Sequence, residues 1–205
     1  YHLPDKFLLV ANQFWEHKNH AVVIDALAIL ASRGMSVCGV FTGLPLDYRS
    51  PMNGTISAVL QRIAERKLIG QIVPLGLVPR REFGSLMRRA TLIIQPSRFE
   101  GWSTVVQDAH ALGRPVICSD IPVHREQATD ALGFFDCDDA EGLAGLIERY
   151  WPDLEPGPEA AAEHRGHERA LEQARCYGMA LLELCRGDSH SGQVDSVEDE
   201  PPLRR

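Results

Sequence analysis

The sequence predicts an α/β fold, in which an open parallel β-sheet carries helices on both faces. From residue 6 to residue 150, short apolar runs of strand length alternate with stretches of helical periodicity. The centres of these runs, such as LLV, TLII and PVIC, are continuously apolar, which is typical of strands buried on both faces. Because ligands of such sheets bind beyond the carboxyl ends of the strands, we expect the functional residues there.

The individual elements follow from local signals in chain order. Apolar residues at helical spacing, such as Val23 and Leu27, mark the helix faces that pack on the sheet. Gly70 and Gly113 are expected helix stops, and Pro115 cannot continue a helix. The expected strands are 6–12, 35–43, 71–76, 91–97, 115–120 and a weaker one at 131–136. The expected helices are 20–32, 56–68, 79–89, 104–112, 138–150 and 159–185.

Composition divides the chain into three parts. Residues 1–151 form the expected sheet domain, which includes a turn-rich loop at 44–54. Residues 152–186 hold a linker, PDLEPGPE, and a long helix rich in Ala and Glu. Residues 187–205 have almost nothing apolar to bury, so we expect a disordered acidic tail. The chain enters a strand soon after Tyr1, and we expect it to be a piece of a longer protein.

Composition also weighs against several classes of protein. The net charge of -7 lacks the basic footprint of nucleic-acid-binding domains. The five cysteines form no CxxC pair, which favours reduced thiols in the cytoplasm over disulfides or zinc. No run approaches the roughly 20 apolar residues of a membrane span. The sequence shows no constellation of metal ligands and no dinucleotide, Walker or Gly-x-Ser-x-Gly motif, so we expect no metal and no other cofactor.

The first candidate segment is NQFWEHKNH, residues 12–20, where a strand ends and a helix starts near Asn19. Free N–H groups and the dipole at a helix N-terminus favour anions. Lys18 adds a positive charge and His17 a possible hydrogen-bond donor, which together suit a phosphate or diphosphate. The alternative is that Asn19 is an N-cap and Lys18 a solvated side chain.

The second candidate segment is EGWSTVVQD, residues 100–108, at the next helix start. Its first amides, near Thr104 and Val105, can receive an anion. Glu100 stands before them, and Asp108 follows about two helical turns later. Two acceptors flanking backbone donors suit a nucleotide sugar, with hydroxyls at both ends and a diphosphate between. The alternative is that Glu100 caps the helix and Asp108 is exposed.

The remaining polar residues near strand ends are interpreted structurally. A third strand ends at Gly76, where backbone groups are accessible. The arginines of the following helix, Arg80, Arg81, Arg88 and Arg89, are expected on a solvated face. His124 and Glu126 are near a strand end, but such residues more often cap and anchor a helix.

Together these motifs resemble the nucleotide-sugar-binding C-terminal domain of GT-B glycosyltransferases, specifically the retaining enzymes of family 4 (glycosyl transferases group 1). The resemblance covers roughly residues 6–150. Its strongest element is Glu100-Gly101-(six residues)-Asp108, which matches the family's Glu-x7-Glu signature, followed by ALGRPVICSD in place of its A-x-G-x-PVI strand. The resemblance implies a Rossmann-like sheet, the C-terminal half of a GT-B fold.

The resemblance also implies a role for each matched residue. Glu100 would contact the donor sugar hydroxyls, Asp108 the ribose, and the amides of Thr104 and Val105 the diphosphate. Lys18 would stabilise charge on the departing nucleoside diphosphate, which makes Glu100 and Lys18 the expected catalytic residues. The expected donor-binding residues are Gln13, His17, Lys18, Gly76, Leu77, Val78, Glu100, Gly101, Trp102, Ser103, Thr104, Val105 and Asp108.

Three positions depart from the family pattern. Many members carry an arginine five residues before the lysine, where this chain has Gln13, so His17 or the helix dipole would replace part of that charge. Asp108 is one methylene shorter than the family's glutamate. The segment STVV replaces the commoner Gly-Leu-Pro-Val and keeps its backbone donors. The nucleotide base would lie against the backbone of residues 76–78.

A GT-B enzyme has two domains, and the N-terminal one holds the acceptor site. The resemblance therefore implies that this chain binds a donor, and that an acceptor glycan or lipid-linked sugar is held by a domain outside it or by a partner chain. The full enzyme would serve glycan or polysaccharide biosynthesis, with peripheral membrane association as one option. Two alternatives stay open: a nucleotide-sugar epimerase of GT-B type, and a non-catalytic interaction module derived from a transferase domain.

Overall fold

The structure is a computed structural model that describes residues 1–45 and 54–186. Within these residues, six parallel strands form one sheet in the order β3-β2-β1-β4-β5-β6. The strands are β1 (Leu8–Ala11), β2 (Gly39–Thr42), β3 (Ile72–Gly76), β4 (Leu92–Gln95), β5 (Val116–Ser119) and β6 (Gly133–Phe135). The predicted α/β class is confirmed, and each strand lies inside its predicted range.

The strand order changes direction at β1. From β1 the chain adds β2 and β3 on one side, then crosses to the other side to add β4, β5 and β6. β1 and β4 are therefore neighbours, although they are far apart in the sequence. The carboxyl ends of such a pair form the crevice in which open α/β sheets bind ligands.

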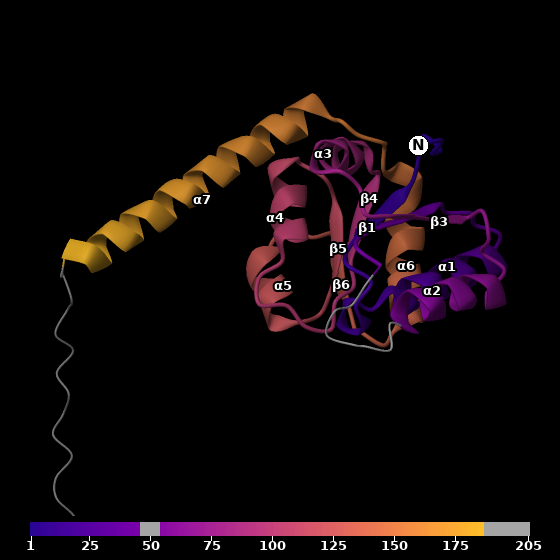
Figure 1. Ribbon diagram of the computed structural model, residues 1–205. Coiled ribbons are helices and arrows are strands. Elements are labelled where there is room, and N and C mark those ends of the chain that lie inside the picture. The colour runs from indigo at the N-terminus through magenta and orange to yellow at the C-terminus, as the bar shows by residue number, and fades with distance from the viewer. Residues whose placement is uncertain (46–53, 187–205) are drawn as a thin grey trace, which may run out of the picture. The chain divides into compact units, whose positions relative to one another are not determined.

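Helices cover both faces of the sheet (Figure 1). Along β1, Leu8 and Val10 join a core with α1, α2 and α6, whereas Leu9 and Ala11 join a core with α3 and α4, because successive strand residues point to opposite faces. The helices are η1 (Glu16–Lys18), α1 (His20–Ser32), α2 (Gly54–Glu65), α3 (Arg80–Arg89), α4 (Thr104–Ala111), α5 (Pro122–Gln127), α6 (Ala140–Tyr150), η2 (Trp151–Asp153) and α7 (Ala160–Arg186).

α1 matches its predicted range, the bounds of α3, α4, α6 and α7 agree with theirs to within two residues, and three larger differences remain. α2 begins and ends earlier than 56–68. α5 was not predicted, because its six residues are too few to show a helical period, although Pro122 stands at a favourable first position. η1 and η2 are single short turns that periodicity also misses. Of the predicted loop at 44–54, residues 46–53 lie outside the described residues, as does the predicted tail at 187–205.

The chain divides into two compact units, Tyr1–Ala170 and Leu171–Arg205. The first extends beyond residue 151, where we expected the domain to end, because the following residues pack on it. The Arg114 guanidinium donates to the carbonyl of Glu155 over 3.1 Å, and Arg88 pairs with Glu163 at 2.7 Å. In the second unit, the described part of α7 exposes its large apolar side chains, which are Leu171, Tyr177, Met179, Leu181, Leu182 and Leu184.

Candidate functional site

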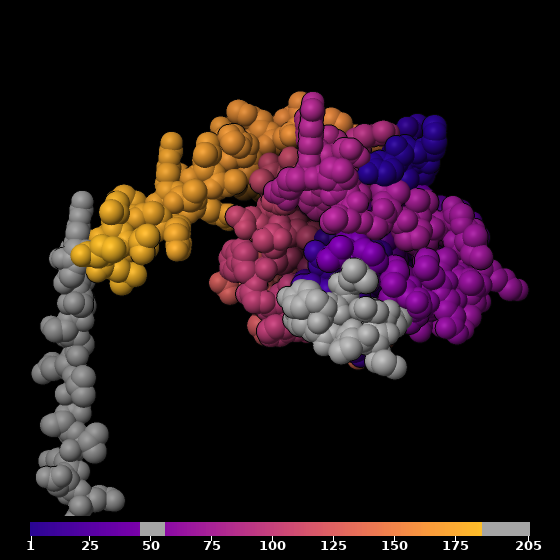
Figure 2. All heavy atoms as spheres, in the orientation of Figure 1, coloured from indigo at the N-terminus to yellow at the C-terminus, as the bar shows by residue number. Residues whose placement is uncertain are grey.

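A cavity of about 670 Å³ opens at the carboxyl ends of the central strands. It is bounded by the ends of β1, β2 and β4, by the residues that follow β3, and by the start of α4. In the space-filling view, indigo atoms of the early chain lie in a hollow between the purple segment and the pink segment (Figure 2). The cavity therefore lies at the predicted edge of the sheet, beside the point where the strand order reverses.

Most of the predicted donor-binding residues meet in this cavity. Those that line it are Gln13, Lys18, Leu77, Val78, Glu100, Trp102, Ser103, Thr104 and Val105. Those that do not are His17, Gly76, Gly101 and Asp108. The cavity is also lined by residues outside the predicted donor-binding set, which are Ala11, Asn12, Trp15, Thr42, Gly43, Pro79, Arg80, Phe83 and Gln95.

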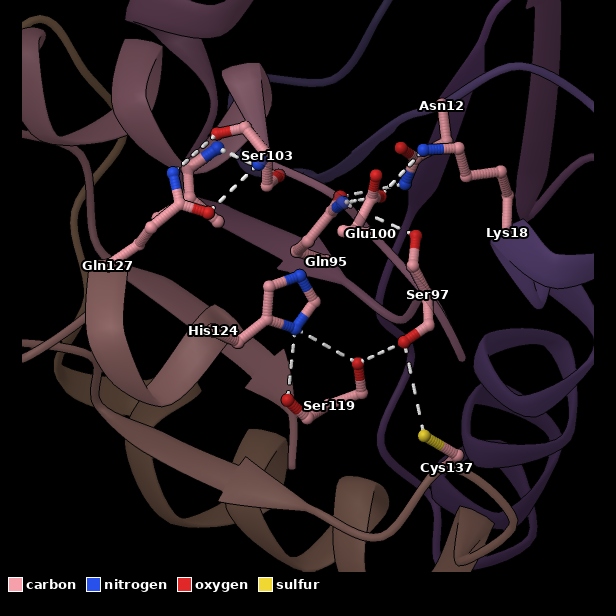
Figure 3. Close-up of polar contacts among 11 residues, drawn as sticks. Asn12, Lys18, Gln95, Ser97, Glu100, Ser103, Ser119, His124, Gln127 and Cys137 are labelled. Carbon is pink, nitrogen blue, oxygen red and sulfur yellow. Dashed lines mark hydrogen bonds and ion pairs between the residues drawn. The ribbon is translucent and has the colours of Figure 1, made fainter. Parts of the chain in front are cut away.

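The two predicted catalytic residues bind each other. Lys18 Nζ lies 2.6 Å from Glu100 Oε1, and their side chains are 13% and 9% exposed. Lys18 is the last residue of η1, and Glu100 lies on the loop between β4 and α4, so the pair joins two segments across the sheet (Figure 3). Partners this well buried hold each other in place, since removing one leaves the other charge uncompensated.

Two buried side-chain amides, those of Gln95 and Asn12, hold the Glu100 carboxylate in place. Gln95, the last residue of β4, is fully buried and donates through Nε2 to Glu100 Oε1 over 2.7 Å. Asn12 Nδ2 donates to Gln95 Oε1 over 2.8 Å, which fixes which end of the Gln95 amide faces Glu100. Asn12 follows β1 and meets Gln95 because β1 and β4 are neighbours. The sequence showed Gln95 as one polar residue in an apolar strand, and that was the available signal.

The turn before α4 presents backbone donors to the cavity. Ser103 is the N-cap of α4: its hydroxyl accepts from Val106 N over 3.4 Å, and its carbonyl accepts from Gln107 N over 3.2 Å. The next N–H groups towards the helix start, those of Thr104 and Val105, have no acceptor inside the helix. Both residues line the cavity, so this turn offers two amides at the positive end of a helix.

Gln127, at the end of α5, holds this turn from behind. Ser103 N donates to Gln127 Oε1 over 2.9 Å, and Gln127 Nε2 donates to the Ser103 carbonyl over 3.2 Å (Figure 3). Gln127 was not predicted as a site residue, since neither its helix nor its place beside α4 is visible in local patterns.

Asp108 and Arg80 form a pair at the edge of the site. Arg80 Nη1 lies 3.6 Å from Asp108 Oδ2, and the two side chains are 83% and 35% exposed. We expected Arg80 on a solvated helix face, but as the first residue of α3 it also lines the cavity. The other three of these arginines do lie at the surface, where Arg88 pairs with Glu163 and Arg89 with Asp5.

Two of the predicted residues, Gln13 and Gly76, make hydrogen bonds that connect backbone segments. Gln13 lines the cavity, but its Oε1 accepts from Leu44 N over 2.6 Å, which ties it to the chain that follows β2. Gly76 adopts a φ of +67°, and its carbonyl accepts from Gly43 N over 2.8 Å. Leu77 is 67% exposed and Val78 is buried, so of this segment the Leu77 side chain extends furthest into solvent.

His124 lies fully buried behind the site, in agreement with its interpretation as an anchor. Its Nδ1 lies 3.0 Å from the Ser119 carbonyl and 3.1 Å from the Ser119 hydroxyl. Burial lowers the pKa of His124, and the hydrogen bond with Ser119 opposes that change. Glu126, the other residue considered there, is exposed.

The described residues show neither a metal-binding cluster nor a membrane-spanning helix. Residues 1–45 and 54–186 contain no group of three or more His, Cys, Asp or Glu side chains placed to hold a metal ion. Among the helices of the same residues, none is both long enough and apolar enough to cross a membrane.

Comparisons with known proteins agree with this fold. A sequence relative is EpsF of Bacillus subtilis (strain 168), whose name assigns it provisionally to the glycosyltransferases; it is 32% identical over 108 residues, which are 53% of this chain and 26% of EpsF. A solved sucrose-phosphate synthase from Thermosynechococcus elongatus is 20% identical with a TM-score of 0.64, over 88% of this chain and 47% of that one. A UDP-forming trehalose-phosphate synthase from Burkholderia xenovorans is 15% identical with a TM-score of 0.70, over 89% and 45%.

The chain thus spans half or less of the length of these proteins. The structural matches show the fold alone, and they confirm the Rossmann-like sheet of GT-B type. The family model for glycosyl transferases group 1 matches residues 2–159, which is most of the chain. This chain belongs to the family Glycosyl transferases group 1.

Proposed function

We propose that this domain binds a nucleotide-diphosphate sugar as the donor for retaining glycosyl transfer, as the C-terminal half of a family 4 enzyme of GT-B type. The observation that carries the proposal is the meeting of Glu100, Lys18 and the start of α4 in one cavity at the switch point of the sheet. Such a cavity supplies an acceptor for hydroxyls, a cation and backbone donors within one ligand's reach.

The diphosphate fits the start of α4. The N–H groups of Thr104 and Val105 and the positive end of the helix dipole stabilise negative charge without any side-chain movement. Lys18 adds a full charge once it exchanges Glu100 for a phosphate oxygen. As the bond to the nucleoside diphosphate breaks, negative charge grows there, and these groups stabilise it. The chain's own residues supply this electrostatic stabilisation in our proposal, and no metal is needed for it.

The donor sugar fits against Glu100. Its Oε1 is held by Lys18 and Gln95, which leaves the carboxylate able to accept further hydrogen bonds from hydroxyls. The base would lie against the backbone at Leu77 and Val78, which line the same cavity. The ribose would meet Asp108 at the edge, in exchange for the exposed contact with Arg80.

The acceptor is assigned to a part of the protein outside this chain. The chain spans 26% of EpsF and less than half of the two synthases. We therefore propose that a second domain brings an acceptor glycan or lipid-linked sugar to the open side of the cavity, in glycan or polysaccharide biosynthesis. One matched structure is a UDP-forming enzyme, which makes UDP the first donor nucleotide to test.

Calorimetric titration with UDP and GDP tests the donor site directly. We expect one of them to bind the wild-type chain, and Lys18→Ala to weaken that binding because it removes a cation from the cavity. The control is Lys67→Gln, since Lys67 is another lysine and does not line the cavity. A folded wild-type chain that binds neither nucleotide would contradict the proposal and favour the non-catalytic interaction module.

A second titration separates the sugar from the nucleotide. Glu100→Ala should weaken the binding of UDP-sugars or GDP-sugars more than that of bare UDP or GDP, because Glu100 is assigned to the sugar and its loss frees Lys18. Equal losses for both ligands would remove the assigned role. Product analysis of the longer protein without an acceptor separates transfer from epimerisation.

A further inference from the structure

The Gln127 side chain makes two hydrogen bonds with the backbone of Ser103, at the start of α4. Its amide oxygen accepts from Ser103 N over 2.9 Å, and its amide nitrogen donates to the Ser103 carbonyl over 3.2 Å. Ser103 is itself 2% exposed, so its backbone groups depend on these protein partners rather than on solvent. A side-chain amide matches both needs, because it carries one acceptor and one donor.

The helix that bears Gln127 is also fixed near its middle, at His124. His124 Nδ1 lies 3.0 Å from the Ser119 carbonyl, which can only accept, so Nδ1 carries the proton. The Ser119 hydroxyl in turn donates to the carbonyl of Ser97. His124, Ser119 and Ser97 are all fully buried, which leaves this part of α5 little freedom to move.

The same segment therefore holds both ends of the loop that carries Glu100. Ser119, at the end of β5, holds the loop at Ser97, and Gln127, at the end of α5, holds it at Ser103 (Figure 3). Between these points lie Glu100 and the turn into α4. The Ser103 carbonyl and the Thr104 N–H belong to one planar peptide unit, so the contact with Gln127 also sets the direction of the Thr104 N–H, at the turn that Val105 continues.

We propose that Gln127 is a positioning residue for the donor diphosphate, and that α5 is a brace that aims the α4 amides into the cavity. This inference rests on the proposed function, because it is the diphosphate that these amides would bind. Gln127 does not line the cavity, so it acts through Ser103 and touches no substrate. Displacement of donors by as little as about 1 Å is enough to lower binding and rate strongly.

The first test compares ligands with and without phosphates. Gln127→Met keeps the length of the side chain and removes both hydrogen bonds, and Gln127→Glu keeps the acceptor but loses the donor. The control is Glu126→Met, since Glu126 is the exposed neighbour on the same helix. The chain is titrated with UDP and GDP by calorimetry, and with uridine and guanosine by NMR, while thermal unfolding reports stability.

We expect Gln127→Met to weaken binding of the nucleoside diphosphate roughly tenfold to hundredfold. We expect the affinity for the nucleoside to stay at its wild-type value and Gln127→Glu to show a smaller loss than Gln127→Met. The control should bind every ligand like the wild type. Equal losses for diphosphate and nucleoside, or no loss for either, would overturn the positioning role.

A second test needs no ligand. The amide resonances and hydrogen-exchange rates of Thr104 and Val105 should change in Gln127→Met and not in Glu126→Met. If changes at Lys18 and Glu100 lower nucleotide affinity but changes at Gln127 do not, the role of α5 as a brace is overturned and the donor site is kept. A wild-type chain that binds no nucleotide overturns the donor site and the brace together.

Discussion

The two walls of the cavity differ in how their polar groups are used. On the wall formed by residues 11–18, Asn12 bonds Gln95, Gln13 bonds Leu44 N, and Lys18 pairs with Glu100. On the opposite wall, Gln127 and Ser103 satisfy the groups around the turn, and Thr104 and Val105, whose N–H groups have no acceptor inside the helix, line the cavity. The second wall is therefore preorganised for an anion. On the first wall, Lys18 must leave Glu100 before it can contact an anion.

The largest expected effect concerns the backbone of the first wall. Gly43 has a φ of +147°, and a Cβ there would lie 2.1 Å from the Asn12 carbonyl oxygen. Gly43→Ala should lower the free energy of unfolding by more than about 4 kcal/mol, since neither backbone can move without breaking the end of β1 or β2. Urea unfolding measures this, with Gly84→Ala on α3, where a Cβ meets no atom within 4 Å, as the control. Equal stability of the two variants would show that this wall is not rigid.

The next effect separates the structural part of the Lys18–Glu100 pair from its ligand-binding part. Lys18→Met should cost about 3 kcal/mol of stability, because it leaves the nearly buried Glu100 carboxylate without its cation. The double variant Lys18→Met/Glu100→Gln should regain most of that stability, since no charge is left unpaired. It should still fail to bind UDP or GDP as tightly as the wild type. Recovery of nucleotide affinity in the double variant would contradict the assignment of Lys18 to the diphosphate.

The third effect is a pH dependence beneath the first wall. His20 is 2% exposed and its ring stacks on Phe14 at 4.7 Å between centroids. Burial is the main cause that lowers the pKa of His20 from 6.5 to about 4, with a smaller contribution from the charge of Lys18. Because the unfolded chain binds the proton at higher pH than the folded chain, stability is complete above pH 6.5 and falls as the pH drops towards 4.

This loss should amount to about 2 kcal/mol between pH 7 and pH 5. Thermal unfolding across this range measures it, and His20→Phe, which cannot bind a proton, should reduce the slope. If the slope of stability against pH is unchanged in His20→Phe, the pH dependence comes from other groups.

The smallest effect concerns the edge of the site. Arg80 is 83% exposed, so its contact with Asp108 should contribute under about 0.5 kcal/mol to stability, and less at high salt. Arg80→Ala should change nucleotide affinity weakly, with Arg81→Ala as the control on the same helix. If Arg80→Ala instead lowered affinity as much as Lys18→Ala, Arg80 would be the main cation for the diphosphate.

Much of this site could be predicted from local sequence, because hydrophobic periodicity and turn residues mark where strands and helices begin and end. Apolar runs of strand length located all six strands, so Lys18 and Glu100 could be placed at one edge of the sheet. Asp108 shows the limit of such reasoning. Its spacing from Glu100 suggested a shared side of the helix, yet in the structure it faces Arg80 of α3 and does not line the cavity.

The sequence by itself determined the fold class and the segments that surround the cavity, because periodicity and turn residues act over a few positions. The tertiary structure alone decided which polar groups meet. Asn12 reaches Gln95 across 83 residues because β4 lies beside β1, and Gln127 reaches Ser103 across 24 residues because α5 packs behind α4. Such pairings depend on strand order and helix packing, which no local pattern contains.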